Sequence, residues 1–317
     1  MKSKYGMSGR PNWLSLSNGD IQYGASMLSR LIMATGVFIR NRVHVVTCSF
    51  AAVWGWGKLT GTQLLPEDLL TVPLAIACIY SWNRLHDFRE DLINSPIAAR
   101  LAIRSRIAIR SFCLVGVLII LGLSLLRGER WAVSLLILVM IMGFLYSTPI
   151  SQYGRTKRLK NIFLVKNLIS ILGWSLLTVV YPAVHGGASM NVHHWFAFMV
   201  MSATVFIVEI IWDIRDLDGD QQAGIKTIPV ELGVTAAIQW VVAINSFSAL
   251  ITLGGLYFGV LPLTWLFVLV NNLLVAFWIW QGGRKILIQR VWSHALVALQ
   301  TVLLICLGLL AVFVDAQ

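Results

Sequence analysis

The 317-residue sequence is poor in charge: Asp, Glu, Lys and Arg make up only 12% of it, against roughly 25% in a typical soluble domain. Hydrophobic residues make up 57%. So few charged residues cannot cover the surface of a soluble domain, and so apolar a composition also excludes a disordered or collagen-like chain. The sequence therefore predicts an integral membrane protein.

Cysteine is scarce as well, with only four residues in the chain: Cys48, Cys78, Cys113 and Cys306. All four fall inside apolar stretches, and none belongs to a CxxC pair or to a Cys/His pattern typical of zinc sites. This usage excludes a disulfide-based scaffold. We interpret the four cysteines as small packing residues.

What the sequence does contain is long apolar stretches of the length needed to cross a membrane, about 20 residues. They predict an all-α membrane protein in which residues 43–314 form a single transmembrane domain, and residues 1–42 a segment in the cytoplasm or on the membrane surface. Nine such stretches are present, at residues 43–60, 67–88, 105–126, 130–147, 161–183, 192–214, 235–258, 261–281 and 291–314.

The basic residues are sorted to one side of these predicted spans. If the N-terminus is cytoplasmic, 22 of the 25 Lys and Arg residues fall on that side, and only Lys58, Arg127 and Arg130 fall on the other. Cytoplasmic loops are typically rich in Lys and Arg, so we expect a cytoplasmic N-terminus and a C-terminus on the opposite side. Topology and attraction to anionic membrane lipid then explain the net charge of +11, and no nucleic-acid partner is predicted.

The acidic residues are concentrated instead of spread. Eight of the 14 lie in two short segments: Asp87, Glu90 and Asp91 in one, and Glu209, Asp213, Asp216, Asp218 and Asp220 in the other. The spacing of Asn83, Asp87 and Asp91, and that of Glu209, Asp213, Asp216 and Asp220, places each set on one face of a helix. The two sets end the second and the sixth span on the predicted cytoplasmic side, which suggests a pseudo-repeat of four plus four helices.

Carboxylates in this arrangement fit Mg²⁺, which bridges protein carboxylates to substrate phosphates. An amphiphilic diphosphate would place its head at the acids and its tail between the helices. Three alternatives are weaker. Two periodic sets on one face are unusual for solvated loop charges, a transporter site would lie nearer the midplane, and Asp216-x-Asp218-Gly219-Asp220 lacks the sixth-position glycine and the closing glutamate of a calcium loop.

Three motifs in this order resemble those of the UbiA-type intramembrane prenyltransferase superfamily. The first is Asn83-xxx-Asp87-xxx-Asp91 with Asn94-Ser-Pro96. The second is Asp213-xx-Asp216-x-Asp-Gly-Asp220, followed by Gly224-Ile-Lys226-Thr. The third is Tyr146-Ser-Thr-Pro149, with Lys157-Arg158 and Lys166-Asn167 after it.

The resemblance implies helices around a central cavity and Mg²⁺-dependent transfer of a polyprenyl group from an isoprenoid diphosphate to an aromatic or lipid acceptor in the membrane. It implies metal-binding and catalytic roles for Asp87, Asp91, Asp213 and Asp216, with Asn83 and Asp220 as further metal ligands. It implies substrate-binding roles for Asn83, Tyr146, Lys157, Arg158, Asn167 and Lys226. Trp82, Tyr146 and Trp212, beside the motifs, are candidates for lining the cavity, and Glu209 either meets an acceptor or pairs with a basic residue.

The sequence departs from the usual pattern in the first motif, where Arg84 follows Asn83 in place of an aspartate. The second motif is more similar to members that prenylate glycerol phosphates or tetrapyrrole-type acceptors. A terpene cyclase of the same superfamily would need the same acids and is the alternative function. A transporter or a non-catalytic membrane protein is a more distant one. Protein partners, prenyl length and acceptor are not indicated by the sequence.

Overall fold

The computed structural model describes residues 42–315 apart from 127–128, 153–154 and 289, and leaves the side chains of 151–157, 281–292 and 311–315 undescribed. Residues 39–317 form one compact unit, to which the following description applies. The domain boundary predicted at residue 42 involves residues outside the described part, and it stays a prediction.

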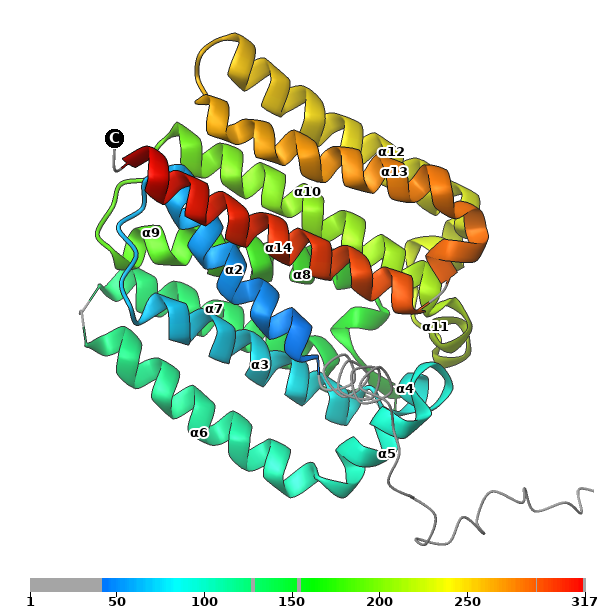
Figure 1. Ribbon diagram of the computed structural model, residues 1–317. Helices are drawn as coiled ribbons and strands as arrows, with labels where there is room; N and C mark the ends of the chain where they lie inside the picture. The colour runs from blue at the N-terminus through cyan, green and yellow to red at the C-terminus, as the bar shows by residue number, and fades with distance from the viewer. Residues whose placement is uncertain (1–41, 127–128, 153–154, 289, 316–317) are drawn as a thin grey trace, which may run out of the picture. The chain divides into compact units, whose positions relative to one another are not determined.

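The described chain is almost entirely helical, as predicted (Figure 1). Long helical segments occupy the nine predicted positions: α2 (Val43–Thr60), α3 (Asp68–His86), α6 (Arg106–Leu125), α7 (Arg130–Ser147), α8 (Val165–Ser175) with η3 (Leu176–Val180) and α9 (Tyr181–His185), α10 (Val192–Arg215), α12 (Ile228–Tyr257), α13 (Leu266–Ile288) and α14 (Arg290–Asp315). Shorter helices lie between them: α4 (Phe88–Asn94), α5 (Pro96–Arg104), η2 (Leu159–Asn161), α11 (Leu217–Ala223) and η4 (Leu263–Trp265).

Seven helical segments in the described part of the chain are long and apolar enough to cross a membrane, which confirms an all-α membrane architecture. The segments α2 and α3 are not among the seven, because polar residues such as Lys58 and Asp68 interrupt their apolar character. Both pack extensively on other helices, α2 on α14 and α3 on α6. Nine membrane crossings and a repeat of four plus four helices therefore stay predictions.

A short antiparallel hairpin follows α7 and was not expected from the sequence. Its strands are β1 (Ile150–Gln152) and β2 (Arg155–Lys157), and the register pairs Ile150 with Lys157. The hairpin returns the chain to the end of α3, where the Arg158 Nη1 group donates a hydrogen bond to the backbone carbonyl of His86 at 3.0 Å. The residues after α7 are thereby brought to the first acidic motif.

The fifth long segment changes its helical type part-way. Between α8 and α9 the turn η3 is a π-helix. Pro182, near the start of α9, has no N–H to donate to the carbonyl of Thr178, and its ring crowds that carbonyl. A π turn accommodates this misfit, and such turns are frequent at functional sites. Leu176 and Leu177, in the π turn, line the cavity described below.

Small residues allow α2 and α14 to approach each other closely. A Cβ atom at Gly55 of α2 would lie 2.8 Å from the backbone oxygen of Leu304 in α14, and one at Gly308 of α14 would lie 1.8 Å from Trp54 Nε1 in α2. Membrane helices commonly pack through such small residues, because close backbone approach maximises van der Waals contact.

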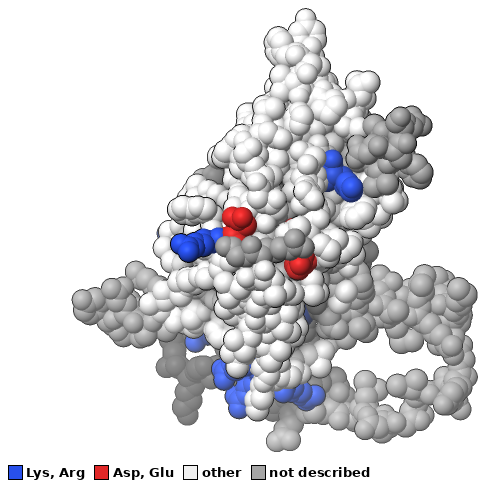
Figure 2. Space-filling model, turned by 90° about the vertical axis from the view of Figure 1, so that its left-hand side faces the viewer, with Lys and Arg blue, Asp and Glu red and all other residues white. Residues whose placement is uncertain are grey.

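The two ends of the helical unit differ in charge. The short helices α4 and α11, which carry motif acids, lie at one end, whereas α14 finishes at the other (Figure 1). The face at that second end is mostly uncharged and shows only a few Lys, Arg, Asp and Glu side chains (Figure 2). The side of the unit that faces the cytoplasm stays a prediction.

We expect Gly55→Ala to destabilise the protein by about 1–3 kcal/mol, because its Cβ would overlap a backbone atom that cannot rotate away. Unfolding midpoints in detergent would measure the loss. Gly122→Ala in α6 is the matched control, since a Cβ there meets nothing within 4 Å. Equal midpoints for both variants would contradict close packing of α2 against α14.

Candidate active site

A cavity lies among α3, α7, α8 and α10, at the end of the unit that carries α4 and α11. It holds about 1050 Å³ of space between atoms, part of it open to solvent. Among the described residues, its lining includes seven acids and four bases: Asp87, Glu90, Asp91, Glu209, Asp213, Asp216 and Asp220, and Arg42, Lys160, Lys166 and Arg215. The cavity is thus charged at one end and apolar deeper in, where Ile76, Val139 and Leu176 line it.

The first acidic motif is held by cations from the segment after the hairpin. Lys160 Nζ lies 2.6 Å from Asp87 Oδ1 and also pairs with Glu90. Arg158 contacts Glu90 through Nη1 at 2.9 Å, and Asp87 through the same atom at 3.7 Å. Lys160 is 3% exposed and Glu90 is 4% exposed, so solvent screens these ion pairs only weakly. They therefore hold the first motif in place more firmly than exposed ion pairs would.

Asp91 is the member of this motif that keeps an oxygen available. Its Oδ2 atom is buried and has no hydrogen-bond partner, although it lines a cavity. Burial raises the pKa of the Asp91 carboxyl to about 6, even though Arg42 acts to lower it. At neutral pH the carboxylate is therefore mostly ionised, and it can bind a cation.

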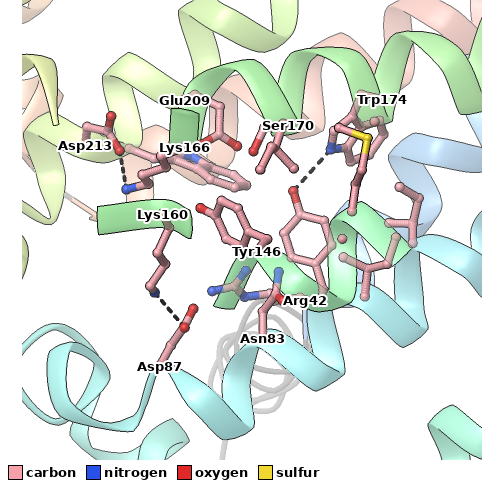
Figure 3. A pocket seen from close by; sticks show the side chains of 18 of the residues that line it. Arg42, Asn83, Asp87, Tyr146, Lys160, Lys166, Ser170, Trp174, Glu209 and Asp213 are labelled. Carbon is pink, nitrogen blue, oxygen red and sulfur yellow. Dashed lines mark hydrogen bonds and ion pairs between the residues drawn. The ribbon is translucent and has the colours of Figure 1, made fainter. Parts of the chain in front are cut away.

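The second acidic motif is organised around Lys166, at the start of α8. Its Nζ atom lies 2.5 Å from Asp213 Oδ1 and 3.2 Å from Asp220 Oδ2. Asn167, one residue along, donates from Nδ2 to Asp213 Oδ2 at 3.2 Å. One ammonium group thus joins the end of α10 to α11, and Figure 3 shows Lys166 and Asp213 across the cavity from Lys160 and Asp87.

The remaining acids of the second motif differ in their surroundings. Asp216 ends α10 and pairs with the neighbouring Arg215. Asp220 is buried in α11, and burial raises the pKa of its carboxyl to about 6, although Lys166 acts to lower it. Asp218 is exposed and does not line the cavity. Three of the four aspartates of this motif therefore converge on the cavity.

The two motifs also touch each other through α4 and α11. Asn94, at the end of α4, donates from Nδ2 to the backbone oxygen of Asp216 at 3.4 Å. Gly219 lies directly against it, and a Cβ there would come within 2.3 Å of Asn94 Nδ2. A glycine at this position therefore leaves room for the contact without a shift of the Asn94 side chain.

Asn83 and the aromatic residues define the inner wall. Asn83 is buried, and with its amide nitrogen directed toward α7 it donates to the carbonyls of Ile79 and Gly143 at 3.3 and 3.2 Å. Tyr146 lines the cavity, and its ring centre lies 5.9 Å from Lys160 Nζ. Trp212 also lines the cavity, whereas Trp82 does not and instead donates to Thr148 Oγ1 at 3.0 Å.

Four predicted substrate-binding residues are not among the described residues that line the cavity. Arg158 and Asn167 support lining residues through the contacts given above. Lys226 is exposed, in the link between α11 and α12, and does not line the cavity. The side chain of Lys157 lies outside the described part of the chain. The roles of all four stay predictions.

Several lining residues were not assigned to the site from the sequence. Lys160 and Lys166 were given no role at the site, although Lys166 belongs to the third motif. Tyr80 lies one turn before Asn83 on α3, and Trp174 donates from Nε1 to its hydroxyl at 3.2 Å. The i, i+3 spacing from Asn83 could have indicated Tyr80, whereas Trp174 and Lys160 are brought in only by tertiary packing.

Within the described residues, no three His, Cys, Asp or Glu side chains come together as a ready-made metal site. Lysine and arginine groups stand between the carboxylates instead. The fold and this cavity define an integral membrane protein with a charged chamber at one end of a helical bundle and an apolar interior. Residues 44–297 match the model of the UbiA prenyltransferase family, and the chain belongs to that family.

Two curated relatives are digeranylgeranylglyceryl phosphate synthases. The protein from Sulfolobus acidocaldarius is 28% identical over 218 residues, which cover 64% of this chain and 70% of the relative. The protein from Sulfurisphaera tokodaii is 28% identical over 204 residues, which cover 61% and 68%.

Solved structures show the same fold. A UbiA homolog from Archaeoglobus fulgidus bound to GPP and Mg²⁺ matches with a TM-score of 0.66 at 17% identity, over 87% of this chain and 99% of that chain. The apo structure of a UbiA homolog from Aeropyrum pernix K1 matches with a TM-score of 0.62 at 17% identity, over 87% and 98%. The chain is thus a UbiA-type prenyltransferase in fold and family.

We expect Lys166→Met to lower the free energy of unfolding by about 3–5 kcal/mol, because it leaves the buried carboxylates of Asp213 and Asp220 without their ammonium partner. Denaturant unfolding in detergent with EDTA would measure it. Adding Asp213→Asn should recover part of the loss, since the double variant carries one fewer buried charge. A loss below about 1 kcal/mol in the single variant would contradict the bridging role.

Proposed function

We propose that this protein transfers a polyprenyl group from an isoprenoid diphosphate to a lipid acceptor within the membrane, in a reaction that depends on Mg²⁺. The two motifs would hold the diphosphate end of the donor, and the apolar part of the cavity its hydrocarbon chain. The observation that carries the proposal is the charge of the cavity lining.

Seven carboxylates and four cationic side chains leave the described lining with an excess of negative charge. A prenyl diphosphate is itself an anion, so a cavity of this composition would repel it. Divalent cations would reverse the balance, because each would add two positive charges beside the carboxylates. The composition therefore suits a diphosphate that binds together with metal ions and poorly without them.

The residues present fit Mg²⁺. The acids supply hard oxygen donors, and Asp91 Oδ2 is a buried oxygen without a hydrogen-bond partner. Magnesium commonly uses only one or two protein carboxylates, with substrate phosphates and waters completing its shell. The lack of a three-residue cluster among the described residues is therefore compatible with this ion.

We assign Asp87 and Asp91 to one metal ion, with Asn83 in support, and Asp213, Asp216 and Asp220 to a second. Lys160 and Lys166 border the same cavity. When the donor binds, their ammonium groups would contact diphosphate oxygens and interact less closely with the carboxylates. Bound Mg²⁺ would supply positive charge that stabilises the departing diphosphate.

The transfer step itself depends on the shape and the lining of the cavity. The C1–O bond of the donor would break and its electron pair leave with the diphosphate, while an acceptor oxygen bonds to C1 and its proton passes to the released diphosphate. The apolar lining deeper in the cavity would keep water away from the allylic cation, which water would otherwise capture. The faces of Tyr146 and Trp212, both on the lining, can stabilise that cation.

For the acceptor we propose a glyceryl phosphate that already carries one prenyl chain. Adding a geranylgeranyl group to geranylgeranylglyceryl phosphate would give the product for which the two curated relatives are named. Their 28% identity supports this acceptor over an aromatic one. We also propose that the acidic end of the unit faces the cytoplasm, as the distribution of Lys and Arg suggests.

We expect Asp87→Ala and Asp216→Ala each to abolish turnover, because each removes a carboxylate assigned to a metal ion. Product formation at saturating Mg²⁺, with thermal unfolding as the test of folding, would show it. EDTA should inactivate the wild type, and added Mg²⁺ should restore it. The matched control is Asp218→Ala, an exposed position of the same motif, which should keep its activity.

We expect the wild-type protein, given geranylgeranyl diphosphate and Mg²⁺, to form a prenylated lipid only when geranylgeranylglyceryl phosphate is also present. Mass spectrometry of extracted products would detect it, with 4-hydroxybenzoate as an aromatic acceptor in a parallel reaction. A cyclic hydrocarbon formed without any acceptor would identify a terpene cyclase instead, and a prenylated benzoate would overturn the lipid acceptor.

A further inference from the structure

A second chamber lies beside the cavity, bordered by α2, α10, α13 and α14. It has two parts, with about 500 and about 400 Å³ of space between atoms, part of it open to the surroundings. Both parts are lined by Met201, Thr204, Gln300 and Leu304, so they adjoin each other. We call the two parts together the second chamber.

The second chamber meets the active-site cavity at four residues that line both: Tyr80, Trp174, Glu209 and Trp212. Arg42 lies over the Tyr80 ring at 5.1 Å, and Tyr80 is fixed by the hydrogen bond from Trp174. Among the described residues, Glu209 is the only carboxylate on the lining of the second chamber. A molecule in this chamber could therefore place a polar head beside the diphosphate site and keep the rest of its length in apolar surroundings.

The active-site cavity already has an apolar region of its own. Ile76, Ile79, Val139 and Leu177, from α3, α7 and η3, line it, and none of the four lines the second chamber. Two apolar volumes thus extend from one charged centre. A cyclase needs room for one hydrocarbon chain, whereas transfer between two amphiphiles needs room for two.

The second chamber is long enough for a lipid chain. Its lining runs along α10 from Trp212 to Val200, which is roughly 18 Å at the 1.5 Å rise of an α-helix. Gln300, 5% exposed, lines both parts, and its Nε2 atom has no hydrogen-bond partner. Asn271 Oδ1, on the lining of the deeper part, also has none. Buried polar groups of this kind require a hydrogen-bond partner. The second chamber is therefore suited to holding a ligand and not to packing as a dry apolar core.

We propose that the second chamber binds the hydrocarbon chain of the acceptor lipid, with its hydroxyl-bearing head between Glu209 and Trp212. The inference rests on the proposed function and extends it, since it assigns donor and acceptor chains to separate volumes. The donor chain occupies the region between α3, α7 and α8, and the acceptor chain the region between α2, α10 and α14.

The test is to narrow the second chamber without touching the charged site. Thr204→Trp places an indole where the two parts join. It should raise the KM for geranylgeranylglyceryl phosphate about tenfold or more, equivalent to about 1.4 kcal/mol, and leave the KM for geranylgeranyl diphosphate unchanged. Ile169→Trp, on the lining of the active-site cavity, is the matched control and should raise the donor KM instead.

A second measurement does not depend on the folding of a variant with a larger side chain. Cys48 lines the second chamber, whereas Cys78 and Cys113 are buried and Cys306 is exposed. In a Cys306→Ser background, geranylgeranylglyceryl phosphate should slow the modification of Cys48 by N-ethylmaleimide, measured by mass spectrometry. Geranylgeranyl diphosphate with Mg²⁺ should not.

The outcomes separate the two proposals. If the wild type converts the diphosphate without an acceptor, both the proposed function and this inference are overturned. If the wild type transfers to the lipid, but Thr204→Trp raises the donor KM or neither KM, this inference alone fails. Protection of Cys48 by the donor and not by the acceptor would likewise overturn it.

Discussion

The site depends on ammonium groups held between buried carboxylates. Lys166 joins Asp213 to Asp220, and Lys160 joins Asp87 to Glu90, so each acidic motif is gathered around one lysine. Without these cations, the mutual repulsion of so many carboxylates at low exposure would drive the helix ends apart or force the acids to take up protons. The lysines come from α8 and from the segment after the hairpin, which ties those elements to the motifs. Ion pairs therefore hold the helices together at the charged end of the bundle, whereas side-chain packing holds them together deeper in it.

The helices that enclose the cavity owe their shape to local irregularities. Pro182 forces a π turn into the fifth segment, and Leu176 and Leu177 in that turn form part of the apolar wall. Gly143 on α7 lies so close to Ile79 on α3 that a Cβ would come within 2.7 Å. On the other side, Gly55 brings α2 against α14. Small and irregular positions thus decide where the bundle is tight and where it leaves space.

Much of this arrangement could be predicted from the sequence, because helical periodicity is local. The spacing of Asp87 and Asp91, and of Asp213, Asp216 and Asp220, indicated which acids share a face, and all five line one cavity. The positions of the basic side chains were harder to predict. The roles of Lys157 and Lys226 at the diphosphate stay predictions, and the described lysines that line the cavity, Lys160 and Lys166, were given no role from the sequence. Which lysine reaches the site depends on the hairpin and on how α8 docks, and neither leaves a periodic signal. The pairing of Tyr80 with Trp174 is likewise a matter of tertiary packing.

The contact between Gly219 and Asn94 has a consequence for how this enzyme can change over evolutionary time. Because the Asn94 side chain of α4 lies against Gly219 of α11 and donates to the Asp216 carbonyl, a shift in one helix affects the other, although the two lie more than a hundred residues apart in the sequence. Substitutions in the two motifs are therefore expected to be epistatic, with the effect of one depending on the residue present in the other. The two halves of the chain are constrained to diverge together, and a motif exchanged between relatives would have to bring its counterpart with it.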